Sequence, residues 1–355
     1  MDSQLTQLCD SARQVVDGLG LAADEESSWA LMAELGWFMV SAAEELGGLG
    51  LGIAGACALH QELGRSLSRV PFLPQMLAIE AVSRSPLAQQ DEWLPSMLSG
   101  ERVVTAALGE SSFHLEKNTD GGFRLNGLVQ AVPSADSASY LIVESAQHNC
   151  VALVGSAQPG MTLIARPTWD VTRRLFDIQA DDVVLEKNLV LVEGDASQIL
   201  IQQLAVLRDF ALAADAVGAS QALLKLTVEY LQTRVQFGRP LALFQALKHR
   251  CADLKALTDG ADSLLQDNLA AVLDTHGEVV LTVETEMKAR ATKQLACSAF
   301  ATVAEESLQL HGGIGMTSEH ECHLFLKRAL LNEHLGRSQE SYDLGLADLF
   351  IASTQ

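Results

Sequence analysis

The sequence predicts an α+β fold in which a middle β domain is inserted between two helical regions. Two patterns predict it: apolar residues recur at helical spacing toward both ends of the chain, and short β-rich runs alternate with turns between them. The 355 residues are 48% apolar and 19% charged, so the chain can bury a sizeable core. Because no long linker or internal repeat interrupts the sequence, we expect the three blocks to pack into one body.

Residues 1–101 are predicted to form an N-terminal helical domain. Leu31, Leu35 and Phe38 recur at helical spacing, and glycine clusters mark the breaks between helices. The glycines of residues 47–52 lie near the spacing of a dinucleotide-binding loop, but no strand precedes them and no βαβ unit follows. This segment is therefore interpreted as a loop between helices.

Residues 102–194 are predicted to form a middle β-barrel-like domain. The runs at residues 103–107, 140–143 and 183–185 are rich in side chains that favour strands, and residues 157–160 form a turn between two of them. The spacing of the turns indicates a domain of roughly 90 residues.

Residues 195–355 are predicted to form a C-terminal four-helix bundle. Proline is nearly absent from this region, and its first segment carries an apolar face at steps of three and four residues. The residues of that face are Leu200, Leu204, Leu207, Ala211, Ala214, Val217 and Leu224. Long amphipathic helices of this kind bury their apolar faces against one another, which is why a bundle is expected.

The charge and the cysteine content exclude several classes of protein. Lys and Arg number 24 against 45 Asp and Glu, so the formal net charge is −21 and binding to nucleic acid is disfavoured. Six cysteines occur without a CxxC pair, and the N-terminus lacks the basic and apolar segments of a signal peptide. We therefore expect free thiols, a cytoplasmic location and, since no long uncharged apolar run occurs, no membrane span.

One short cluster contains residue types that bind metals. His320, Cys322 and His323 are close in sequence, but no further residues complete a zinc-binding pattern with them. We expect no metal site and assign this cluster to the surface of a helix.

Two stretches of the C-terminal region resemble signatures of the acyl-CoA dehydrogenase family of flavoproteins. The first runs from Arg234 through Gln245 to Asp253 and resembles R-x-x-F-G-x-x-x-x-x-x-Q-x-x-x-x-x-x-A-D. The second, residues 309–315, resembles Q-x-x-G-G-x-G. Further matches to the family's N-terminal helices and β domain lie at residues 35–37, 44–50, 62–65, 125–127 and 135–136. The resemblance therefore spans nearly the whole chain.

The resemblance implies an enzyme that removes two hydrogens from the α and β carbons of an acyl-CoA thioester. The implied cofactor is FAD, and the implied electron acceptor is an electron-transfer flavoprotein. The family's order of domains, with N-terminal helices, a β domain and a four-helix bundle, is the order that the sequence pattern predicts.

The resemblance also implies which residues hold FAD. Arg234 matches an arginine that contacts the pyrophosphate of FAD bound mainly by the neighbouring subunit, and Phe237 and Gln245 match residues that contact the adenosine part. The remaining cofactor-binding candidates of the two signatures are Gln236, Gln309, Gly312 and Gly313. In the alternative interpretation, Arg234 is a solvated cation at a helix end and the two glycines form an ordinary helix C-cap.

The position of the catalytic base departs from the family pattern. Many relatives place a glutamate 24 residues beyond the glycine matched by Gly312, and this position is Gly336. A second group places it 26 residues before the arginine matched by Arg234, and this position is Arg208. The adjacent Asp209, in an otherwise apolar helical segment, is the candidate base; the alternative is a structural ion pair with Arg208.

The β domain departs from the family pattern as well. Residues 130–135 replace a Trp-Ile-Thr segment that packs on the flavin, and residues 109–113 replace an acidic-Pro and Gly-Ser-Asp stretch. Similar losses are typical of a branch in which two different chains form an α2β2 heterotetramer that acts on bulky acyl-CoAs, including those with steroid side chains. The resemblance thus implies an acyl-CoA dehydrogenase or a subunit of one, assembled as a homo- or hetero-oligomer; the alternative is a non-catalytic subunit that completes a partner's FAD site.

Overall fold

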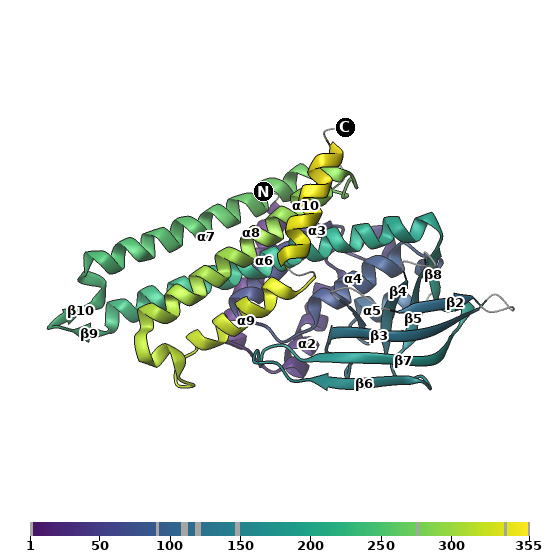
Figure 1. The fold of residues 1–355 in the computed structure, drawn as a ribbon, viewed down its shortest axis with the longest axis horizontal. Helices are drawn as coiled ribbons and strands as arrows, with labels where there is room; N and C mark the ends of the chain where they lie inside the picture. The colour runs from purple at the N-terminus through teal and green to yellow at the C-terminus, as the bar shows by residue number, and fades with distance from the viewer. Residues whose placement is uncertain are drawn as a thin grey trace.

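The computed structural model describes residues 3–89, 92–107, 113–117, 122–145, 150–274, 277–336 and 339–353. It confirms the α+β fold: N-terminal helices, a middle pair of sheets and C-terminal helices follow one another along the chain (Figure 1). Strands begin at Val104 and end at Glu193, and the next helix begins at Asp195. The domain boundaries at residues 101/102 and 194/195 stay predictions.

The N-terminal region consists of five helices with short 3-10 turns between them. The helices are α1 (Ser3–Leu19), α2 (Glu25–Glu34), α3 (Gly52–Arg65), α4 (Phe72–Ser83) and α5 (Trp93–Leu98), and the turns are η1 (Trp37–Met39), η2 (Glu44–Leu46) and η3 (Pro86–Gln89). Asp24 caps α2 by accepting a hydrogen bond from the backbone N–H of Ser27. The glycine-rich residues 47–52 lie between η2 and α3, so they connect helices as predicted.

The middle domain contains two four-stranded sheets that share one core. One sheet has the order β1-β4-β5-β8 and the other the order β2-β3-β7-β6. Their strands are β1 (Val104–Ala106), β2 (His114–Lys117), β3 (Phe123–Pro133), β4 (Tyr140–Ser145), β5 (Cys150–Gly155), β6 (Met161–Arg166), β7 (Leu175–Leu185) and β8 (Val190–Glu193), with η4 (Lys187–Leu189) before β8. Buried residues from both sheets, among them Leu125, Val143 and Ile178, form a single apolar cluster. Residues 109–112 of the altered family stretch lie outside the described residues.

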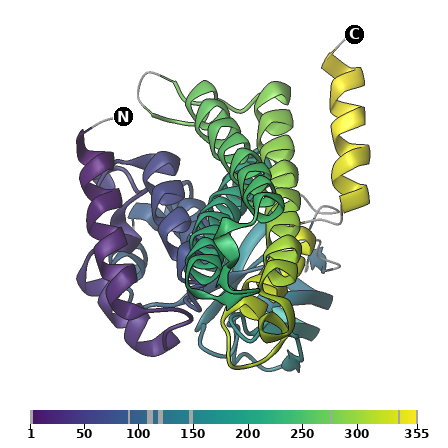
Figure 2. The ribbon, with the colours of Figure 1, turned by 90° about the vertical axis from the view of Figure 1, so that its left-hand side faces the viewer.

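The C-terminal region is built around the 39-residue helix α6 (Asp195–Thr233). A short hairpin, β9 (Val235–Gln236) and β10 (Arg239–Pro240), leads through η5 (Leu241–Leu243) to α7 (Gln245–Ala271). Then follow α8 (Val283–His311), η6 (Gly312–Met316), α9 (Cys322–His334) and α10 (Gln339–Ser353). In Figure 2, α10 stands at the edge of the bundle, where it packs against α8.

Helix α6 joins the N-terminal helices through a crossing at which backbones touch. A Cβ atom on Gly218 of α6 would lie 1.8 Å from the carbonyl oxygen of Gln61, and one on Gly64 of α3 would lie 2.2 Å from the carbonyl oxygen of Asp215. Only glycine allows this approach. None of the helices within the described residues is both long and apolar enough to cross a membrane.

Candidate functional site

The first signature forms a hairpin that projects from the end of the bundle (Figure 1). Helix α6 ends because Arg234 takes an extended backbone conformation, and its N–H donates to the carbonyl oxygen of Tyr230 at 2.8 Å. Phe237 and Gly238 turn the chain with positive φ values of 53° and 78°. Phe237 on this hairpin is 90% exposed. A phenylalanine that packs in a hydrophobic core is almost fully buried.

Cationic, aromatic and amide side chains gather on this hairpin. The guanidinium of Arg239 lies 4.0 Å from the ring centre of Phe244, whose ring in turn meets Phe237 edge-on. Arg234 is exposed and has no ion pair within the part of the chain that the structure describes. Gln236 and Gln245 are exposed on the hairpin and at the start of α7. An unpaired cation beside exposed aromatic rings is suited to an anionic ligand with an aromatic part.

The second signature forms the turn after α8, at the same end of the bundle as the hairpin (Figures 1 and 2). Gly312 has a φ of 65°, and a Cβ atom on Gly312 or Gly313 would meet nothing within 4 Å. Both glycines and Gln309 are exposed, as is Met316 at 70%. The turn is a helix C-cap, as the alternative interpretation stated, and it also leaves a stretch of backbone open to another molecule.

The two positions at which relatives carry a base lie next to each other in the fold. A Cβ atom on Gly336 would lie 3.0 Å from Nε of Arg208 and 2.5 Å from the hydroxyl oxygen of Tyr342. Neither Arg208 nor Gly336 supplies an acid, and Tyr342 of α10 fills the space beside them. The place where a relative would hold its catalytic carboxylate therefore contains a guanidinium and a phenol.

Asp209 is buried in an ion pair at this place. Its side chain is 2% exposed, and Oδ1 accepts hydrogen bonds from Nε of Arg208 at 2.9 Å and from the Tyr342 hydroxyl at 2.7 Å. Burial by itself would lower the pKa of Arg208, but the interactions with the Asp209 carboxylate and the Tyr342 hydroxyl are together larger, so the pKa of the guanidinium is raised. Burial and Asp209 also raise the pKa of Tyr342. The ion pair that the alternative interpretation described is present, and the role of Asp209 as a base stays a prediction.

Two members of this cluster were not foreseen from the sequence. Tyr342 comes from α10, 133 residues beyond Asp209, and Lys293 comes from α8. The Lys293 ammonium lies 4.4 Å from the ring centre of Tyr342 and donates to the carbonyl oxygen of Glu333 at 2.9 Å. Burial lowers the pKa of Lys293. No local pattern marks either residue, because the contact between them joins two helices that are distant in the sequence.

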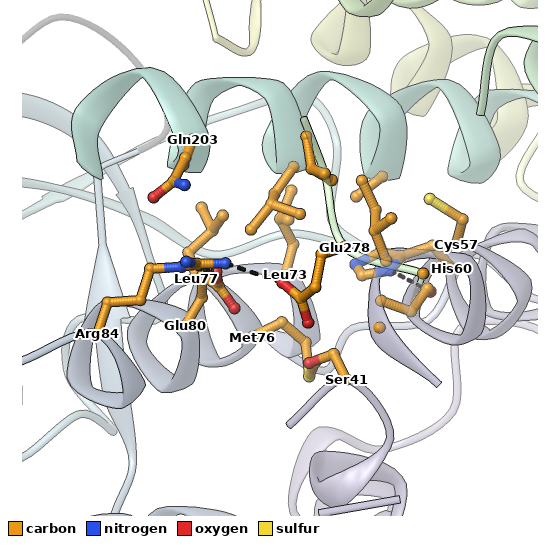
Figure 3. Close-up of a pocket in the computed structure, with 17 residues that line it drawn as sticks. Ser41, Cys57, His60, Leu73, Met76, Leu77, Glu80, Arg84, Gln203 and Glu278 are labelled. Atoms are coloured by element: carbon orange, nitrogen blue, oxygen red, sulfur yellow. Dashed lines mark hydrogen bonds and ion pairs between the residues drawn. The ribbon is translucent and has the colours of Figure 1, made fainter. Parts of the chain in front are cut away.

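A small cavity lies between α3, α4 and α6, and residues 277–279 cover it (Figure 3). His60 and Cys57 lie at one end of it, and Arg84 and Gln203 at the other. Burial lowers the pKa of His60 to about 4, so its imidazole is neutral. The volume is about 50 Å³, well below the roughly 150 Å³ of a cavity that holds benzene. This cavity is therefore too small for an acyl chain.

In the β domain, the segment that replaces Trp-Ile-Thr forms the end of β3. Ala131 has a φ of 57°, and its N–H donates to Oδ1 of Asp177 at 3.1 Å, at an irregularity in the pairing of β3 with β7. Residues 130–135, which occupy the region of the family's Trp-Ile-Thr segment, contain no aromatic side chain. Within the described residues, no group of three or more His, Cys, Asp or Glu side chains is arranged to hold a metal ion.

This succession of helices, paired sheets and helical bundle is the architecture of the acyl-CoA dehydrogenase fold. Comparison with family models matches residues 11–101 to the acyl-CoA dehydrogenase N-terminal domain and residues 198–341 to its C-terminal domain. The chain belongs to the acyl-CoA dehydrogenase family. Its resemblance to that family is thus confirmed, and FAD is the cofactor that membership assigns.

Relatives and solved structures agree with this assignment. Acyl-CoA dehydrogenase IpdE2 of Mycobacterium tuberculosis is 34% identical over 309 residues, which cover 86% of this chain and 80% of that protein. A structure described as the Tcur3481-Tcur3483 steroid ACAD G363A variant superposes with a TM-score of 0.87 at 26% identity, covering 99% of this chain and 98% of that one. The ChsE4-ChsE5 complex from Mycobacterium tuberculosis superposes with a TM-score of 0.88 at 23% identity, with the same coverage.

The exposed residues of the two signatures fit a dinucleotide. The pyrophosphate of FAD needs positive charge, which the unpaired Arg234 offers, and the exposed turn at Gly312 and Gly313 leaves room for a ligand to approach the backbone. The exposed ring of Phe237 offers a face for an aromatic base. These groups are exposed and lie outside the chain's own core.

Proposed function

We propose that this chain is one of two different subunits of an FAD-dependent acyl-CoA dehydrogenase. In this assembly it completes the flavin site of its partner, and the partner supplies the base that takes the α proton. The observation that carries the proposal is the cluster of Arg208, Asp209 and Tyr342, which fills the place of the base in this chain. When bound, FAD supplies the acceptor for the hydride that leaves the β carbon.

Three further observations support two different subunits. The cavity between α3, α4 and α6 is too small for an acyl group. The segment of the β domain that packs on a flavin in relatives has lost its aromatic side chain. The exposed hairpin and the Gly312 turn, by contrast, keep their family residues. A chain that retains only its outward-facing cofactor residues is suited to serve a neighbour's site.

Two solved structures of the same fold support a proposal for the substrate class. One solved structure of the same fold is described as a steroid ACAD, and another is a complex of two different chains. We therefore propose a bulky acyl-CoA, such as one with a steroid side chain, as substrate and an electron-transfer flavoprotein as acceptor. All six cysteines are free, which supports the reducing cytoplasm as the compartment.

The proposal is tested on the assembly isolated through an affinity tag on this chain. Mass spectrometry identifies the chains, and absorbance gives the flavin content per chain. We expect FAD only in an assembly that contains a second acyl-CoA dehydrogenase chain. A monomer of this chain with stoichiometric flavin that bleaches anaerobically with an acyl-CoA would overturn the proposal.

Arg234→Ala tests the contribution of the hairpin. A charge-assisted contact contributes about 1.5–3 kcal/mol, so the variant should bind FAD at least about 10-fold more weakly. Arg124→Ala, which changes an arginine of β3, is the control and should leave FAD binding unchanged. If Arg234→Ala keeps the parent's affinity for FAD, the hairpin does not belong to the flavin site.

A further inference from the structure

Tyr230 connects the two elements that face the cofactor. It lies one turn before the end of α6, and its carbonyl oxygen accepts the N–H of Arg234 at 2.8 Å. Its hydroxyl donates to the carbonyl oxygen of His311, the last residue of α8, at 3.2 Å. Its ring also stacks on the His311 imidazole, with 4.5 Å between ring centres and 28° between planes. One residue thus contacts the start of the hairpin and the start of the Gly312 turn.

His311 is held rigidly on its own side of this contact. Its side chain is 3% exposed, and Nδ1 lies 2.7 Å from the carbonyl oxygen of Ser307, so Nδ1 carries the proton and donates it. The His320 ring lies 4.3 Å away, and His320 Nδ1 accepts the N–H of Cys322 at 3.2 Å. Burial lowers the pKa of His311, which keeps the imidazole neutral and able to stack.

The three rings of Tyr230, His311 and His320 therefore join α6, α8 and the segment before α9 at the end of the bundle. Terminal turns are the least constrained part of a helix, so two helix ends without such a connection fluctuate more than the packed helices behind them. A ligand that touches both ends must then order them, and this cost reduces its affinity. A preformed spacing between the hairpin and the turn removes the cost.

We propose that Tyr230 and His311 are positioning residues for FAD: they hold the hairpin and the Gly312 turn at the spacing that the dinucleotide requires. Neither residue needs to touch the cofactor, since each acts through a neighbour, Tyr230 through Arg234 and His311 through Gly312. This inference rests on the proposed function, because it takes the hairpin and the turn to be the cofactor-facing elements.

Tyr230→Phe tests the proposal with the smallest change. It removes the hydroxyl that reaches the His311 carbonyl and keeps the stacked ring. In the flavin-containing assembly, stripped of FAD and titrated with FAD, we expect the Kd to rise about 5-fold, as the loss of one hydrogen bond predicts. In the FAD-free assembly, the amides of residues 312–316 should exchange hydrogen faster. The melting temperature should stay within about 2 °C of the parent's.

Two further variants complete the test. His311→Leu removes the stacked ring and should raise the Kd for FAD by about 10-fold or less, with the same faster exchange at residues 312–316. Tyr140→Phe makes the same chemical change as Tyr230→Phe, but in β4 of the middle domain. It should alter neither the Kd for FAD nor the hydrogen exchange at residues 312–316.

The outcomes separate this proposal from the proposed function. If Tyr230→Phe leaves both the Kd and the exchange unchanged while Arg234→Ala weakens FAD binding, the positioning role is wrong and the proposed function stands. If Arg234→Ala also has no effect on FAD binding, the proposed function fails with it. A rise in Kd that appears only together with a general loss of thermal stability assigns Tyr230 an ordinary structural role and overturns the proposal.

Discussion

Asp209→Asn should destabilise the chain without slowing flavin reduction, because the structure places Asp209 in an ion pair and the proposed base lies in the partner. The substitution keeps the size of the side chain and removes its charge. The amide oxygen can still accept a hydrogen bond from Tyr342, but the substitution removes the carboxylate that pairs with Arg208.

The magnitude follows from this geometry. Breaking a buried pair by removing one partner costs about 3–5 kcal/mol. Since the amide retains part of the hydrogen bonding, we expect the lower end, about 3 kcal/mol, which corresponds to about 4 °C in Tm for a chain of this length. Loss of a catalytic base, by contrast, would slow the reaction about 10²–10⁴-fold.

The assay compares thermal unfolding with anaerobic flavin reduction by an acyl-CoA in the same assembly. Asp267→Asn is the matched control, because Asp267 is exposed on α7 and lies outside both signatures. Tyr342→Phe should lower stability by about 1 kcal/mol, since it removes the donor to Asp209 but leaves the ion pair. If Asp209→Asn slows flavin reduction about 100-fold or more with its melting temperature unchanged, Asp209 is the base and the argument from the ion pair is wrong.

Three other predictions concern stability. Arg328→Met should cost about 3–5 kcal/mol in denaturant unfolding, because this fully buried arginine is paired with the carboxylates of Asp170 and Asp215; a loss below about 1 kcal/mol would contradict this. Gly218→Ala should destabilise the fold by about 3 kcal/mol or prevent folding, whereas Gly260→Ala should not destabilise it, because a Cβ atom at this position of α7 would meet nothing within 4 Å. Equal melting temperatures for both variants would refute the backbone contact at Gly218. The pKa of His60 is about 4 in the fold, so the free energy of unfolding should fall by about 3 kcal/mol as the pH drops from about 6.5 to 4, because only the unfolded chain takes up the proton. His60→Gln should make the free energy of unfolding less dependent on pH in this range, and an unchanged slope would contradict the burial argument.

The buried arginine also explains how the three regions form one body. Arg328 of α9 donates to Asp170 and Thr172 in the loop between β6 and β7, and to the carbonyl oxygens of Leu67 and Ser68 between α3 and α4. A single side chain thus fixes the C-terminal helices to the sheets and to the N-terminal helices. The rigid scaffold leaves the hairpin and the Gly312 turn at the free end of the bundle.

The sequence by itself determined the order of the domains and the position of the cofactor-facing segments. Helical and strand periodicity are local properties, and the two signatures around Arg234 and Gly312 are contiguous, so both can be recognised without a fold. The absence of an acid at Gly336 and Arg208 was equally visible in the sequence.

Only the tertiary structure decided what fills the place of the base. Arg208 and Gly336 are far apart in the sequence and meet in space, and Tyr342 reaches them from a helix that the sequence pattern does not place. The same holds for Tyr230, whose partner His311 lies 81 residues away. Local periodicity reports which face of a helix is buried, but not which distant side chain it meets. Which distant side chains meet depends on how the helices cross. Close contacts such as the one at Gly218 determine that crossing.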